Sequence, residues 1–289
     1  MQYWQSDYFY VKNRGQQMGM LRFLYHTAPG RILLKGFTSP GVSKLCGRFL
    51  DSDLSHFLIN PFIQKNKIDI SAYQVDNVRS FNDFFSRKIK PGRRPIDQDP
   101  KHMIAPCDGL LSVWKIGDRT VFPVKQSRYS VGSLLRNEKL AEHYLNGYCF
   151  VFRLCVDHYH RYCYVDSGKK SRNMVIPGIL HTVRPIALEE HPVFVENSRE
   201  YTLIRTPFLG TVVQMEVGAM LVGRIVNYDQ EAVVKRGEEK GMFQYGGSTI
   251  IVLTGENRVD VREDLLENSR NGIETAVKMG EMIGHAREN

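Results

Sequence analysis

The stretch Gly246-Gly247-Ser248-Thr249-Ile250-Ile251-Val252-Leu253 joins two opposite kinds of backbone. Its glycines can adopt conformations that are closed to other residues. The β-branched apolar run that follows, residues 249–253, predicts a buried strand. Ser248 stands where the two meet, so its hydroxyl is either an ordinary turn group or placed for chemistry at its own peptide bond. Taken alone, the tetrapeptide Gly246-Gly247-Ser248-Thr249 favours the interpretation as an ordinary turn.

Similar apolar runs recur after about residue 100, separated by glycine, proline and polar turns. We predict strands at residues 109–114, 147–154, 210–217, 220–226 and 248–253. They show no regular alternation with helices, which favours a mainly antiparallel β core, a sandwich or an open barrel, over a doubly wound sheet. The tail, residues 262–285, has helix-forming residues with one Asn-Gly interruption at 271–272.

The first hundred residues have a helical pattern instead. Apolar residues recur at near-helical spacing in residues 17–26 and 44–58, and the second segment carries a stripe of Leu45, Phe49, Leu50, Leu54, Phe57 and Leu58. Such a stripe more commonly faces a core, but it also suits a helix that lies on a membrane surface. The pattern alone does not separate these two interpretations.

A third helix is predicted to begin at Ser80, whose hydroxyl can cap the free N–H groups, with Asp83 in the first turn. It runs into five positive charges within residues 87–94. This basic segment is either a solvated linker or a collar that faces phosphates. We therefore expect an α+β fold, in which a helical N-terminal region, residues 1–95, lies on a β-rich domain, residues 96–289.

The composition is that of an ordinary folded protein. The chain has 289 residues, of which 42% are hydrophobic and 24% charged. Its five cysteines are odd in number and form no C-x-x-C pair, so a reducing cytosolic compartment is expected rather than a disulfide framework or a zinc site. No segment has the length of a transmembrane helix, and the N-terminus lacks the order of a signal peptide. A net charge of +8 favours anionic partners, but no nucleic-acid-binding motif is present.

Three groups of residues could carry chemistry. Asp108 sits in a Pro…Gly turn before a predicted strand, where an aspartate usually bonds its own backbone. His158-Tyr159-His160-Arg161-Tyr162-Cys163 is dense in polar and aromatic groups, and acid–base work by one histidine fits it better than a metal site. Together with Ser248, these residues would supply the acid and base that a weakly nucleophilic hydroxyl needs. An α/β-hydrolase is excluded because the glycine pattern is incomplete and Ser248 leads into a strand.

Several short segments then match a known family in their order along the chain. They are Phe81-Asn82-Asp83-Phe84-Phe85-Ser86-Arg87-Lys88, Pro106-Cys107-Asp108-Gly109, Tyr159-His160-Arg161-Tyr162, Val217-Gly218-Ala219, Val222-Gly223, Lys235-Arg236-Gly237-Glu238 and Gly246-Gly247-Ser248-Thr249. The sequence resembles the pyruvoyl-dependent phosphatidylserine decarboxylase proenzymes over about residues 78–256. Each segment is weak alone, and their common order makes the resemblance strong.

The resemblance implies an inactive precursor that cleaves itself between Gly247 and Ser248. Asp108 and a histidine would activate the Ser248 hydroxyl, which attacks the Gly247 carbonyl. The products would be a β chain, residues 1–247, and an α chain, residues 248–289, whose first residue becomes a pyruvoyl group. The substrate would be phosphatidylserine in an anionic membrane, bound through a Schiff base, and the products phosphatidylethanolamine and CO₂. Peripheral attachment to the cytoplasmic side of the cell membrane would follow, and a homodimer is left open.

The sequence departs from the family at one position. Many members carry a second histidine three residues after the first, and Cys163 stands there in this chain. We favour His160 as the base, with His158 as the second candidate. Two other functions are kept as alternatives: a pyruvoyl-dependent decarboxylase of a soluble amino acid, and a non-enzymatic lipid-binding β module.

Overall fold

The computed structural model describes residues 40–117, 122–124, 127–179, 193–218, 224–245 and 248–288, together with Phe23, Thr27, residues 29–30 and residues 32–33. The predicted helix at 17–26 therefore lies outside the described residues apart from Phe23. Gly246 and Gly247 lie outside them as well, so the structure describes the predicted cleavage site only from Ser248 onward.

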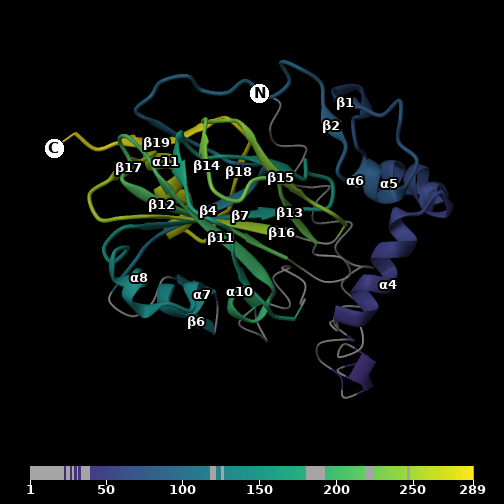
Figure 1. Cartoon of the computed structure of the whole chain (residues 1–289), viewed down its shortest axis with the longest axis horizontal. Coiled ribbons are helices and arrows are strands. Elements are labelled where there is room, and N and C mark those ends of the chain that lie inside the picture. The colour runs from purple at the N-terminus through teal and green to yellow at the C-terminus, as the bar shows by residue number, and fades with distance from the viewer. Residues whose placement is uncertain are drawn as a thin grey trace.

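A nine-stranded sheet forms the centre of the molecule (Figure 1). Its middle consists of β12 (Thr211–Val217), β16 (Ser248–Thr254), β7 (Tyr148–Leu154) and β4 (Gly109–Lys115), in that order. The flanking strands are β14 (Ala232–Val234), β9 (Gly168–Lys170), β11 (Arg199–Arg205), β10 (Met174–Ile176) and β18 (Thr275–Val277). Every ladder in this sheet is antiparallel, which confirms the α+β class with an antiparallel core.

Side chains of successive residues in a strand point to opposite faces of the sheet. Along the central strands both faces are buried, because each is covered by its own apolar cluster. On β16, Ile251 and Leu253 join one apolar cluster, while Ile250 and Val252 join another. The first cluster is closed by α7 (Val131–Leu135), α8 (Glu138–Glu142) and α10 (Val193–Glu196). All seven residues of β16 are buried, which explains its continuous apolar sequence.

Two three-stranded sheets contribute to the cover of the second face. One contains β13 (Ile225–Asn227), β15 (Glu239–Phe243) and β8 (Arg161–Cys163). The other contains β17 (Val259–Val261), β19 (Met282–Ala286) and β3 (His102–Ile104), with α11 (Glu263–Arg270) beside it. Two short antiparallel pairs complete the strands: β1 (Tyr73–Gln74) with β2 (Lys88–Ile89), and β5 (Phe122–Val124) with β6 (Ser127–Tyr129).

The helical N-terminal segment lies to one side of the β core (Figure 1). It consists of α4 (Pro40–Asp51), the 3₁₀ turn η1 (Asp53–Leu58), α5 (Ile59–Asn66), the turn η2 (Ile70–Ala72) and α6 (Phe81–Phe85). Ser80 caps α6, and its hydroxyl and the Asp83 carboxylate form a reciprocal capping box, as the sequence predicted. The domain boundary near residue 95 stays a prediction.

Two expectations were wrong in detail. The segment 44–58 is not one helix, because the chain breaks between α4 and η1. The tail is helical only in α11, and its remainder forms β18 and β19. Of the strand predicted at 220–226, residues 220–223 lie outside the described residues, and β13 begins at Ile225.

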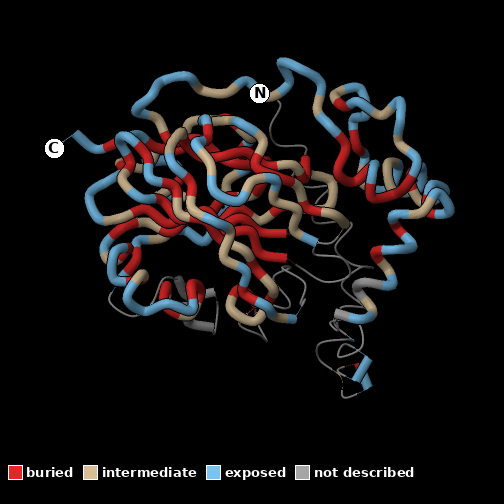
Figure 2. Tube along the Cα trace, in the orientation of Figure 1, coloured by how far each residue is buried: buried red, intermediate tan, exposed pale blue. Residues whose placement is uncertain are grey.

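The apolar stripe of the N-terminal segment does not face a core either. Leu54 is 76% exposed and Phe57 is 66% exposed, and Leu45 and Phe49 are exposed as well, whereas only Leu50 of the stripe is buried. Figure 2 shows this segment as largely pale blue and tan beside the red of the central strands. The more common interpretation of the stripe, a core-facing helix, is therefore wrong for most of its residues.

Candidate active site

Four chain segments meet at one edge of the central sheet. Ser248, the first residue of β16, lies opposite Leu154, the last residue of β7. On the other side of β16, Thr249 lies opposite Val217, the last residue of β12. Because β4 and β7 are antiparallel, with Leu110 opposite Arg153, β4 begins at the same edge. The turn with Asp108, the segment 155–160 and the start of β16 therefore leave the sheet side by side.

Ser248 is fully buried at this edge. Its position in the alternation of β16 places it on the same face as Ile250, which belongs to the second apolar cluster. Its Oγ has no hydrogen-bond partner among the residues that the structure describes. A buried hydroxyl without a partner is unusual and costs free energy, so this atom calls for an explanation.

His160 has the complementary property. Its side chain is fully buried, and its Nδ1 lies 2.9 Å from the carbonyl oxygen of His158. Since a carbonyl only accepts, Nδ1 carries the proton and Nε2 keeps its lone pair. Nε2 is buried and has no hydrogen-bond partner in the described part of the chain. Burial, followed by the nearby Arg87 guanidinium, holds the pKa of His160 well below its usual value, so the ring is neutral at pH 7.

His158 is in the opposite tautomer. Its Nδ1 accepts a hydrogen bond of 3.1 Å from the Cys155 amide, which leaves the proton on Nε2. Burial lowers the pKa of His158, while the carboxylates of Asp157 and Asp108 oppose that shift. Cys155, Asp157 and His158 bring possible metal-ligand atoms within 4.8 Å of one another because they share one tight turn. His158 Nδ1 is engaged by the backbone of that turn.

Cys163 lies beside the Asp108 turn, since its amide donates a hydrogen bond of 2.8 Å to the Pro106 carbonyl. The side chain is 1% exposed. Burial raises the pKa of the thiol to about 12, so it stays protonated at neutral pH. A buried neutral thiol is a poor base, and Cys163 does not replace the missing family histidine in that role.

Asp108 is held by an arginine rather than by a histidine. Arg94 Nε donates to Asp108 Oδ1 at 2.7 Å, and Arg94 Nη2 forms a second, ionic hydrogen bond to Oδ2. The Met279 amide donates to Oδ1 at 3.0 Å. No hydrogen bond between described residues joins Asp108, His160 and Ser248 directly. The structure thus brings the three predicted residues to one edge but does not link them into a continuous relay.

Helix α6 contacts both Tyr245, which lies shortly before Ser248, and His160. The Tyr245 amide donates to the side-chain carbonyl of Asn82 at 3.1 Å. The Phe85 ring packs with its centroid 3.9 Å from that of His160 and 5.1 Å from that of Tyr245. The residues of α6 that pointed to the family therefore contact the segment before the glycines as well as the candidate base.

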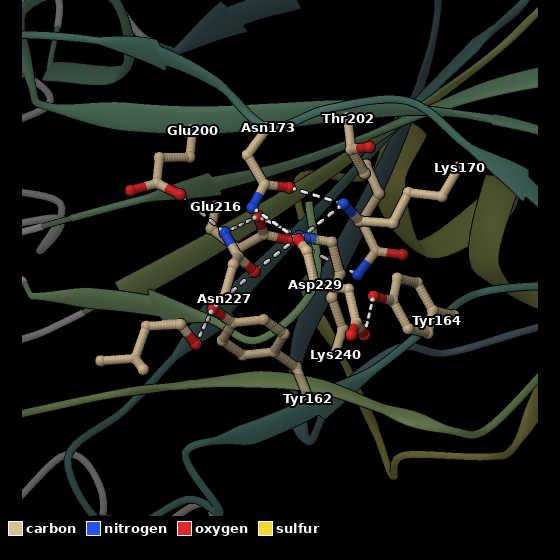
Figure 3. Close-up of polar contacts among 12 residues, drawn as sticks. Tyr162, Tyr164, Lys170, Asn173, Glu200, Thr202, Glu216, Asn227, Asp229 and Lys240 are labelled. Atoms are coloured by element: carbon tan, nitrogen blue, oxygen red, sulfur yellow. Dashed lines mark hydrogen bonds and ion pairs between the residues drawn. The ribbon is translucent and has the colours of Figure 1, made fainter. Parts of the chain in front are cut away.

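A buried polar network lies on the same face of the sheet (Figure 3). Glu216 lies opposite Ile250, so its carboxylate points to the face that Ser248 shares. Lys240 Nζ lies 2.6 Å from Glu216 Oε2 and 2.7 Å from Asn227 Oδ1. Lys170, also fully buried, donates to the Asn173 side chain at 2.9 Å. Burial raises the pKa of Glu216 and lowers that of Lys240, and their mutual attraction opposes both shifts.

Comparison with known proteins gives a consistent answer. The profile of the phosphatidylserine decarboxylase family matches residues 81–285. This chain belongs to the phosphatidylserine decarboxylase family. It is 47% identical to phosphatidylserine decarboxylase proenzyme 2 of Clostridium acetobutylicum, with 93% of each chain covered. It is 39% identical to a phosphatidylserine decarboxylase proenzyme of Clostridium botulinum, with 96% of each covered. A proenzyme of the same name from Ruminiclostridium cellulolyticum is 38% identical over 92% of this chain and 91% of that protein.

Membership in the phosphatidylserine decarboxylase family confirms the resemblance drawn from the motifs. The relatives are named proenzymes, a term for chains that are processed before they act. Sequence reasoning missed Arg94, the partner of Asp108, because it was counted only as one charge of the basic segment. It also missed Asn82, although its place in a family segment was a signal.

Proposed function

We propose that this chain is a self-processing phosphatidylserine decarboxylase that converts phosphatidylserine to phosphatidylethanolamine and CO₂. The observation that carries the proposal is the buried Ser248 Oγ at the start of the central strand, which has no hydrogen-bond partner among the described residues. It lies at the edge where His160 also keeps a buried nitrogen lone pair without a partner among the described residues. Family membership supports the decarboxylation reaction. Ser248 Oγ and His160 Nε2 support the proposed self-cleavage that precedes it.

The processing step uses groups of this chain alone. Ser248 Oγ attacks the Gly247 carbonyl carbon while a base takes the hydroxyl proton, and the peptide bond becomes an ester when the carbon–nitrogen bond breaks. Loss of the Ser248 Cα proton then eliminates the Gly247 carboxylate. The dehydrated residue takes up water and releases ammonia, which leaves a pyruvoyl group at the start of the α chain, residues 248–289. The two glycines before Ser248 suit the distorted backbone that this attack needs.

His160 is the base that the geometry supports best. Its Nε2 is the unprotonated nitrogen, whereas in His158 Nε2 carries the proton. Asp108 acts by electrostatics rather than through a hydrogen bond to His160, because Arg94 and the Met279 amide occupy its oxygens. We assign Asp108 two roles. It holds the turn beside His158, and its carboxylate opposes the lowering of the His158 pKa by burial.

The residues around position 248 fit a pyruvoyl group. The group is smaller than an intact peptide junction, and position 248 is fully buried, which favours neutral over charged forms. When present, its ketone supplies an electrophilic carbonyl for the substrate amine and an acceptor for the electron pair left by departing CO₂. His160 is placed to hold or return a proton at its Nε2.

The N-terminal segment supports attachment to a membrane surface. Its exposed apolar side chains, Leu45, Phe49, Leu54, Phe57 and Ile70, lie on three short elements close together in sequence. None of the helices in the described ranges is long and apolar enough to cross a bilayer. We propose peripheral attachment through this segment to the cytoplasmic side of the cell membrane, because the substrate and product both carry acyl chains.

The test is the mass of the purified protein under denaturing conditions. The wild type is expected as two chains split between Gly247 and Ser248, and Ser248→Ala as one inactive chain. Thr254→Val is the matched control, since Thr254 at the far end of β16 carries another buried hydroxyl without a partner in the described part of the chain. It should still be cleaved. An active wild-type protein that remains in one piece would overturn the proposal.

A further inference from the structure

A polar pocket opens beside the Asp108–Arg94 pair. It has a volume of about 350 Å³, and its charged lining residues are Lys67, Asp69, Arg93, Arg94, Asp157 and Lys278. We call it the basic pocket. Residues from the helical segment, from the basic stretch before β3 and from the C-terminal tail meet there.

The charges of the basic pocket suit a singly charged anion. Arg94 is neutralised by Asp108. The three other cations, Lys67, Arg93 and Lys278, face the two carboxylates of Asp69 and Asp157, which leaves one positive charge in excess. The exposed side chains of Arg93 and Lys278 make no hydrogen bond or ion pair with any described residue, so their donors are available to a ligand.

The pocket shares a wall with the candidate active site. Lys278 directly precedes Met279, whose amide donates to Asp108 at 3.0 Å. Arg94 holds the same carboxylate from the other side of the turn. Asp157 directly precedes His158, whose pKa responds to Asp108 and Arg94. A ligand in the basic pocket therefore lies next to the Asp108 turn and the segment that carries His158.

The pocket also adjoins the exposed apolar elements. Lys67 ends α5, and Ile70, three residues further, is 45% exposed. A lipid whose acyl chains stay in a bilayer beneath this segment would bring its headgroup to the level of the pocket. In phosphatidylserine the phosphate carries one negative charge, and only a few covalent bonds separate it from the serine amine that must reach residue 248.

We propose that the basic pocket binds the phosphodiester of the lipid headgroup, with Arg93 and Lys278 as its donors. This assignment rests on the proposed function and names the subsite that orients its substrate. Arg93 belongs to the future β chain and Lys278 to the future α chain, so the subsite is shared by both products of processing. Charge-assisted hydrogen bonds of this kind bind phosphate well, and arginine can form two at once.

The experiment measures CO₂ release from phosphatidylserine in mixed micelles by Arg93→Gln and Lys278→Gln. Both variants are expected to be cleaved normally, and each should raise KM about tenfold with little change in kcat, since each loses one charged contact that the substrate keeps throughout. Lys169→Gln is the matched control, because Lys169 is an exposed lysine on β9 outside the pocket. It should behave as the wild type.

Two soluble probes separate the sources of the anion. Glycerophosphoserine, which has the phosphodiester but no acyl chains, should compete with the lipid in the wild type and about tenfold less in both variants. Inorganic phosphate should compete only weakly, because the pocket is matched to one negative charge. Inhibition by inorganic phosphate that equals that of glycerophosphoserine would overturn the assignment to a headgroup.

Vesicle sedimentation completes the test. The variants should bind phosphatidylserine vesicles as the wild type does. If they lose vesicle binding while inhibition by glycerophosphoserine is unchanged, the two cations serve surface attachment and the proposal fails. A wild type that is not cleaved and releases no CO₂ defeats the proposed function itself. If the wild type is cleaved and active but both variants keep its KM and its inhibition by glycerophosphoserine, only the assignment of the basic pocket fails.

Discussion

At the scale of single residues, the base for self-processing is the sharpest question. His160→Gln should slow cleavage by about 10²–10⁴-fold, because the amide cannot take the proton that the imidazole Nε2 accepts. Gel electrophoresis of protein sampled over time after synthesis measures this rate. Retained full-rate cleavage would exclude His160 as the base.

Cys163→Ala supplies the contrasting result. The thiol is buried and protonated, so its removal should leave the cleavage rate within about twofold and cost about 1 kcal/mol of stability through the small cavity. A large loss of cleavage in this variant, with the fold intact by circular dichroism, would show that position 163, where many family members carry a histidine, takes part in cleavage.

The sequence predicted Ser248, Asp108 and the histidine segment as candidates, because their residue types and order are unusual. It could not identify the partner of Asp108. Arg94 lies 14 positions away from it, and nothing in local composition says which of five neighbouring cations folds back onto the turn. The choice between His158 and His160 also required the structure, since it depends on which nitrogen each backbone group engages.

At the scale of elements, the Lys240–Glu216 pair connects two strands. Lys240 is on β15, which precedes β16 in the chain, and Glu216 is on β12, which pairs with β16 in the sheet. Lys240→Met should lower the free energy of unfolding by about 3–5 kcal/mol, because Glu216 would remain buried without its counter-charge. Urea unfolding in the uncleaved Ser248→Ala background measures this loss. Adding Glu216→Gln should restore most of it, and simple additivity of the two losses would contradict the pairing.

The exposed helical elements carry a separate prediction about membranes. Leu54→Asp with Phe57→Asp should weaken binding to phosphatidylserine vesicles by at least about tenfold, because apolar contact is replaced by charge. Cleavage should be unaffected. Val233→Asp is the control, since Val233 is 83% exposed on β14 but lies outside the helical segment. Equal losses in both proteins would argue against attachment through these helices.

The central strands were predicted closely, because both of their faces are covered and apolar runs mark them. β16 was predicted as 248–253 and is observed as Ser248–Thr254. β11 was missed, since Arg199, Glu200 and Thr202 interrupt its apolar pattern. The tail strands β18 and β19 were missed because pairing with β4 and β3 overrides the helix preference of their residues.

At the scale of the whole molecule, the α chain of the proposed cleavage, residues 248–289, is part of the centre of the fold. It supplies β16 between β12 and β7, β18 at one edge of the nine-stranded sheet, and β19 as the middle strand of a three-stranded sheet. Native mass spectrometry of the cleaved protein should therefore show both chains in one particle, separable only by denaturant. Free α chain under native conditions would contradict this arrangement.

The place of Ser248 has a consequence for the life history of the protein. Its hydroxyl meets its surroundings only after β16 has entered the sheet between β7 and β12. Under the proposed self-processing, a truncated or misfolded copy would not mature, so maturation would report a completed fold. The proposed cut would also be irreversible. Once the chain is divided, the covalent connection that guided β16 to its place is gone, so a denatured mature enzyme should not recover as its precursor does.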